Sequence, residues 1–152
     1  MNAEPFIEKV VAAMKEARLE GILIGNAAAA IQGAPVTTDD FDFFIRDKPP
    51  WMDKIAEISE ALGAGKFMIP YPEVSDLIRI SAPNIQVDFM FYIGPRLTFE
   101  SVRSRSTVVQ MKAGKLMVAS LADVIKSKKN ANRLKDKAVL PLLEEVLRAS
   151  KK

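Results

Sequence analysis

The chain has 152 residues, of which 49% are hydrophobic and 27% charged, and its net charge is +3, as expected for one soluble globular domain. No apolar run approaches the roughly 20 residues that span a bilayer, and the chain start lacks the basic and apolar blocks of a signal peptide, so we expect a cytoplasmic protein without a membrane partner. Cysteine and histidine are absent, which excludes a thiol nucleophile, a histidine base and cysteine or histidine metal ligands, so any metal must bind to oxygen, as Mg²⁺, Mn²⁺ or Ca²⁺ does.

Apolar spacing and turn residues predict an alternation of helices and strands. In chain order these are a helix over 5–19, a strand over 21–25, a helix over 27–32, a strand over 40–46, a helix over 49–62, strands over 77–80 and 85–93, a helix over 99–103, a hairpin over 108–112 and 116–118, and helices from 120 onward. Gly21 is expected to end the first helix and Asn26 to cap the second. Ser120 and Asp123 form a capping box that opens the C-terminal helices.

The C-terminal segment is expected to be helical to about Arg148, with a kink or a break into two helices at Pro141. The mixed order of helices and strands predicts an α+β fold in which helices pack on a mixed sheet. We expect a single domain, with the sheet in residues 1–119 and the C-terminal helices of residues 120–152 packed on it.

Charge is distributed unevenly along the chain. Residues 37–60 carry seven acidic and three basic side chains, whereas residues 112–137 carry eight basic and two acidic ones. An acidic region can attract metal ions and a basic region can attract phosphate. Solvated helix faces that differ in sign would explain the same pattern.

Three aspartates are the candidate chemical groups. Asp40 and Asp42 lie two residues apart on a predicted strand, so their carboxylates share a face within about 7 Å along the chain. Asp88 lies on a later strand whose other face is strongly apolar. If both strands bury their phenylalanines in one core, the three carboxylates meet on the opposite side, where a divalent cation would relieve their repulsion. Three solvent-facing aspartates on a half-exposed sheet are the alternative.

Residues 23–42, LIGNAAAAIQGAPVTTDDFD, resemble the opening motif of the DNA polymerase beta-type nucleotidyltransferase superfamily. The motif has glycine at a helix start, a second glycine, and then Thr-x-Asp-x-Asp. The third carboxylate of the superfamily would be Asp88 in IQVDFMF, and residues 123–138, DVIKSKKNANRLKDKA, are similar to a C-terminal segment of small bacterial members. The resemblance covers nearly the whole chain and implies a nucleotidyltransferase-like mixed sheet.

The resemblance also implies the roles of particular residues. Mg²⁺ or Mn²⁺ would bind to the catalytic aspartates Asp40, Asp42 and Asp88 and to a nucleoside triphosphate such as ATP. The contacts to the nucleotide would come from the start of the second helix, the Thr-x-Asp-x-Asp motif and the late helix, namely from Gly25, Asn26, Thr38 and Lys128. Asn26 stands where the superfamily usually has glycine or serine, and simple helix capping is the other interpretation of it.

The resemblance implies an enzyme that transfers a nucleoside monophosphate to a hydroxyl of a small molecule, a protein or an RNA end. Toxin–antitoxin systems contain small members of this kind, so a cognate antitoxin, or a second copy of the chain, is a candidate partner. The alternative is an inactive member that binds a nucleotide or a protein. It is favoured by Asn26 and by Val36, where related proteins often carry a basic residue.

Overall fold

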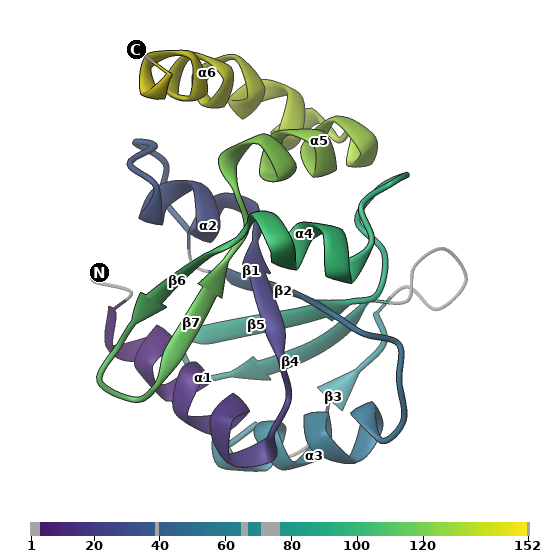
Figure 1. The fold of residues 1–152 in the computed structure, drawn as a ribbon. Helices are drawn as coiled ribbons and strands as arrows, with labels where there is room; N and C mark the ends of the chain where they lie inside the picture. Colours follow the sequence, from purple (N-terminus) through teal and green to yellow (C-terminus); the bar gives the residue numbers. More distant parts are fainter. Residues whose placement is uncertain (1–3, 39, 65–66, 71–76, 152) are drawn as a thin grey trace.

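In the computed structural model, which describes residues 4–38, 40–64, 67–70 and 77–151, a mixed seven-stranded sheet is combined with six helices (Figure 1). The strand order is β3-β4-β5-β2-β1-β7-β6. The strands are β1 (Gly21–Ile24), β2 (Asp40–Ile45), β3 (Phe67–Met68), β4 (Ile78–Ala82), β5 (Ile85–Met90), β6 (Thr107–Gln110) and β7 (Lys115–Val118). The helices are α1 (Glu4–Ala17), α2 (Gly25–Ile31), α3 (Trp51–Ala61), α4 (Phe99–Arg105), α5 (Leu121–Ala131) and α6 (Leu134–Ser150). The predicted α+β class is confirmed.

The alternation of β2 divides the sheet into two faces, as predicted. β2 runs antiparallel to β1 and parallel to β5, with Phe43 opposite Phe89 and Asp42 opposite Asp88. The two phenylalanine rings stack with centroids 5.9 Å apart in the core. Residues that pair in register point to the same face of a sheet, so Asp42 and Asp88 share the other face.

Helices cover both faces of the sheet. A side chain at Gly21 would touch Met14 of α1 together with Phe43 and Ile45 of β2, so α1 lies over the phenylalanine face, and α3 packs against α1. On the face that carries Asp42, the ring of Phe44 contacts Phe99 of α4 at 5.7 Å between centroids. Helix α2 packs against β1 and β2, and α5 packs on α2 and α6 (Figure 1).

Several predicted boundaries differ from the observed ones. Helix α1 ends at Ala17, earlier than predicted, because Arg18 takes a left-handed conformation, while β1 begins at Gly21 as predicted. Strand β5 ends at Met90 instead of residue 93, and the short strand β3 was not predicted. The C-terminal helices separate at Asn132, whose φ of 55° is left-handed, while Pro141 lies inside the continuous α6. The predicted break at Pro141 is therefore wrong, because α6 continues through this residue.

No helix in the described part of the chain is long and apolar enough to cross a membrane.

Candidate active site

The candidate site lies where β1 ends and α2 begins. Gly25 follows β1 directly with a φ of 70°, which favours glycine, and a side chain there would come within 2.7 Å of the Asp42 carboxylate. Ile24 is the register partner of Asp42, so the carboxylate lies beside the first turn of α2. The sequence motif thus brings a glycine turn, a helix start and an acidic side chain together.

Asp42 lies in an environment that disfavours its charge. Burial, the Asp88 charge and the Asp40 charge raise the pKa of Asp42 to about 6, while Lys135 and Lys128 act in the opposite direction. A cation bound next to Asp42 would therefore relieve repulsion that the metal-free chain retains.

Asp40 and Thr38 form the outer part of the site. The Thr38 hydroxyl donates a hydrogen bond to the Asp40 carbonyl oxygen at 2.7 Å and accepts one from the Asp40 N–H at 3.3 Å. Asp40 is exposed at the beginning of β2, opposite Gln86 of β5. In this conformation Thr38 fixes the backbone at the entry to β2.

Asp88 is buried and bound on both oxygens by Arg79 of β4, a residue that the sequence interpretation did not select. Arg79 Nε donates to Asp88 Oδ1 at 2.9 Å, and Arg79 Nη2 donates to Oδ2 at 3.1 Å. Among the described residues, no three acidic side chains come together as a preformed metal site. The signal for Arg79 was the tight turn at Pro83-Asn84, because it fixes the register that places Arg79 opposite Asp88.

Asn26 was predicted to cap α2, but it does not. The cap position is Ile24, and Asn26 lies inside the first turn of the helix. Its buried Oδ1 accepts no hydrogen bond from the residues that the structure describes. A buried acceptor without a partner costs about 1–3 kcal/mol, so a ligand or water that donates to it would be favoured at this helix start.

Lys128 reaches the site from α5 and forms an ion pair with a residue of α6. Its ammonium is buried and lies 3.6 Å from Asp136, which is itself fully buried. Burial lowers the pKa of Lys128, and Asp136 and Asp42 oppose that shift. Asp136 also accepts hydrogen bonds from Arg133, at 2.7 Å from Nε and at 3.1 Å from the backbone N–H.

We expect Lys128→Ala to weaken triphosphate binding by about 1.5–3 kcal/mol, which is roughly 10–150-fold, because a charged donor to phosphate is lost. A smaller loss of stability should accompany it, since Asp136 loses one of two cationic partners. Calorimetric titration and thermal unfolding measure the two effects. Lys129→Ala is the matched control because Lys129 is exposed and pairs with Glu144. Equal affinity in both variants and the parent would show that Lys128 is purely structural.

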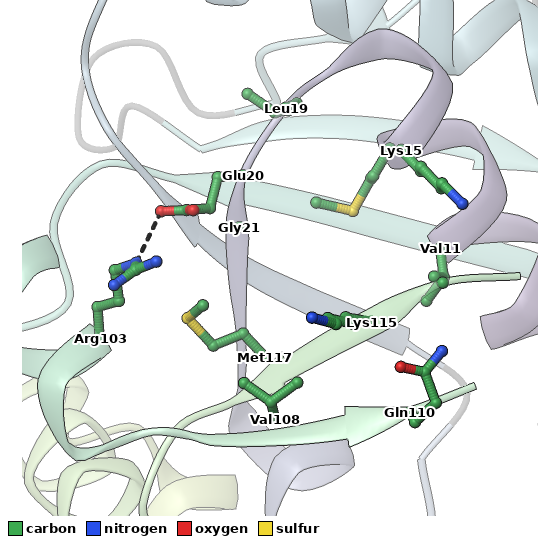
Figure 2. A pocket seen from close by; sticks show the side chains of 12 residues that line it. Val11, Lys15, Leu19, Glu20, Gly21, Arg103, Val108, Gln110, Lys115 and Met117 are labelled. Atoms are coloured by element: carbon green, nitrogen blue, oxygen red, sulfur yellow. Dashed lines mark hydrogen bonds and ion pairs between the residues drawn. The ribbon is translucent and has the colours of Figure 1, made fainter.

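A separate hollow at the start of β1 does not include the aspartates. It encloses about 590 Å³ between α1, α4 and the β6–β7 hairpin, and residues such as Val11, Lys115 and Met117 line it (Figure 2). At its rim Arg103 Nε donates to Glu20 at 3.0 Å, as the dashed line in Figure 2 marks. Neither Asp42 nor Asp88 lines this hollow, so the candidate site is the one at the opposite end of β1.

No model of a known protein family and no curated protein sequence matches the chain. Solved structures do match it. The crystal structure of ANT(2'')-Ia in complex with adenylyl-2''-tobramycin superposes with a TM-score of 0.64 at 18% identity, over 99% of this chain and 92% of that one. The solution structure of the antibiotic-resistance factor ANT(2'')-Ia gives a TM-score of 0.64 at 18% identity, over 97% and 85%.

The crystal structure of TM1012 from Thermotoga maritima, which carries a provisional nucleotidyltransferase assignment, superposes with a TM-score of 0.58 at 18% identity, over 90% of this chain and 89% of that one. These similarities show that the chain has the nucleotidyltransferase fold.

Proposed function

We propose that the protein is a metal-dependent nucleotidyltransferase that moves a nucleoside monophosphate from a nucleoside triphosphate to a hydroxyl group. The observation that carries this proposal is the register of Asp42 and Asp88 on neighbouring parallel strands, beside the glycine turn that opens α2. The nucleotidyltransferase fold supports this proposal. The residues that resemble the motif of the superfamily, 23–42, also contribute Gly25 and Asp42 to this site.

The residues of the site fit a magnesium or manganese ion. Asp40 and Asp42 would hold it, because carboxylate oxygens are the ligands that these ions prefer and because the repulsion at Asp42 is relieved by a cation. When bound, such an ion neutralises phosphate charge and lowers the pKa of a coordinated hydroxyl.

The protein groups have separate tasks in the transfer. The N–H groups at the start of α2 and the Lys128 ammonium would bind phosphate oxygens. The acceptor oxygen forms a new bond to the α-phosphorus, the bridging bond from that phosphorus to the β-phosphate oxygen breaks, and pyrophosphate leaves. The proton of the acceptor hydroxyl passes to Asp88 or to water. With no histidine in the chain, Asp88 is the candidate general base at this end of the site.

A hollow beside Asp40 offers space for the acceptor. It encloses about 850 Å³, and its described lining residues include Val36, Thr38 and Gln86 but no lysine or arginine. A phosphate-rich RNA end would lack cationic partners there, so the hollow favours a small hydroxyl compound that is neutral or positively charged. Label found on protein or RNA would instead favour a toxin with a cognate antitoxin.

We expect a nucleoside triphosphate and Mg²⁺ together to raise the melting temperature by about 5–10 °C. A ligand at about 100 times its dissociation constant stabilises the folded state by roughly 2.7 kcal/mol, and 1 kcal/mol corresponds to about 2–4 °C for a chain of this size. Thermal unfolding with each component alone, with both, and with EDTA measures this. An equal shift in the presence of EDTA would contradict the proposed metal-bridged binding.

The alternative is a protein that binds a nucleotide without transferring it. Two observations favour it: Val36 stands where related proteins often carry a basic residue, and Arg79 occupies both oxygens of Asp88. This alternative predicts the same thermal shift without transfer of label.

A further inference from the structure

Arg79 forms a tight ion pair inside the proposed site. The two residues are register partners on β4 and β5, and the guanidinium donates to both carboxylate oxygens of Asp88, at 2.9 and 3.1 Å. The Asp88 side chain is 7% exposed and that of Arg79 24%, so water screens the pair only in part. Fork-to-carboxylate contacts of this kind are strong and fix the geometry of both groups.

The guanidinium changes the charge balance of the site. Arg79 carries a positive charge that it cannot lose near neutral pH, and its guanidinium occupies both oxygens of Asp88. A second divalent ion between Asp42 and Asp88 would lie close to the Arg79 charge, in a region of reduced dielectric where like charges repel strongly.

The surroundings of the neighbouring Asp42 carboxylate differ from those of Asp88. The basic residues near it, Lys128 and Lys135, act through space and form no ion pair with it among the described residues. Both oxygens of Asp88 are therefore already engaged by a guanidinium, whereas the carboxylate of Asp42 is not held in this way.

We propose that Arg79 takes the place of a second metal ion, so that the site binds a single divalent cation together with the triphosphate. Arg79 is then a positioning residue: it holds Asp88 toward the acceptor and provides a fixed positive charge where charge develops on the reacting phosphate. The inference rests on the proposed function, which itself requires only that at least one metal ion binds with the nucleotide.

The number of bound ions tests the inference without reference to turnover. Mn²⁺ is titrated by electron paramagnetic resonance into the protein with a non-hydrolysable triphosphate analogue. We expect one ion per chain in the parent protein, two in Arg79→Gln, and one in Arg79→Lys, which keeps the charge. Asp88→Asn should still bind one ion, because in this account Asp88 binds Arg79 and not a metal.

Arg105→Gln is the matched control, because Arg105 donates to the buried Asp123 at 2.9 Å in a similar ion pair outside the site, and it should leave the count at one. Circular dichroism establishes that each variant is folded, and Arg79→Lys and Asp88→Asn remain informative if Arg79→Gln does not fold. Two ions in the parent protein with one in Asp88→Asn would overturn the inference and leave the proposed function intact. A count that stays at one in folded Arg79→Gln would also overturn it. Absence of any bound ion in the parent protein would instead contradict the proposed function.

Discussion

Asp42→Asn is expected to weaken metal-dependent triphosphate binding by about 3–5 kcal/mol, which is more than 100-fold, and to abolish transfer. Asp42 lies next to Gly25 at the start of α2, so its carboxylate is the group best placed to join a nucleotide-bound cation to the protein. Calorimetric titration of the triphosphate with Mg²⁺ measures the loss. The control is Asp47→Asn, since Asp47 is exposed just beyond β2. Comparable affinity in both variants would remove Asp42 from the site.

The same substitution should change stability in a pH-dependent manner when metal is absent. The pKa of Asp42 is about 6 in the folded chain, above the usual value of about 4 for an unfolded one. The folded state therefore binds the proton more tightly, and the parent protein loses stability as pH rises from about 4 to about 6. At pH 7.5 Asp42→Asn should be more stable than the parent by about 1–3 kcal/mol, and near pH 4 the difference should largely vanish.

Urea unfolding in EDTA at the two pH values measures this difference. A stability gain that is equal at both values would show that ionisation of Asp42 has no part in it.

Asp88→Asn is expected to separate binding from chemistry. Triphosphate affinity should change by less than tenfold, because Asp42 and Lys128 remain, whereas transfer should fall by about 10²–10⁴-fold, the range for loss of a general base. Stability should fall slightly, because the bidentate contact with Arg79 is lost. Single-turnover transfer of label and calorimetric binding measure the two effects. Parallel loss of both would place Asp88 in nucleotide binding instead.

The arrangement of Asp42 and Asp88 beside the glycine turn could be predicted because two strong local rules agree. Alternation along β2 and β5 separates the phenylalanines from the aspartates, and burial of the phenylalanines forces Asp42 and Asp88 onto one face. The glycine at the end of β1 marks a turn that needs a positive φ. These rules depend on neighbouring residues, so the sequence contains them directly.

The features that were missed depend on contacts between distant residues. Asn26 is a good capping residue, but α2 begins two residues earlier than predicted, at Gly25, which moves Asn26 into the helix. The sequence predicts Lys128 only as a phosphate ligand. Its buried partner Asp136 lies on the next helix, and no local pattern indicates that pairing. At the start of α6, Asp136 accepts a hydrogen bond from the backbone N–H of Arg133. The same helix continues through Pro141. Pattern alone does not specify such packing.

The transfer reaction itself tests the central claim most directly. The protein is incubated with Mg²⁺ or Mn²⁺, cell extract, and each nucleoside triphosphate labelled either at the α- or at the γ-phosphate, with Asp88→Asn as the inactive control. The proposed function predicts that α-label, and not γ-label, becomes attached to an acceptor hydroxyl while pyrophosphate is released in equal amount. Attachment of γ-label would contradict it, and so would the absence of transfer from all α-labelled triphosphates under conditions in which nucleotide and metal are bound.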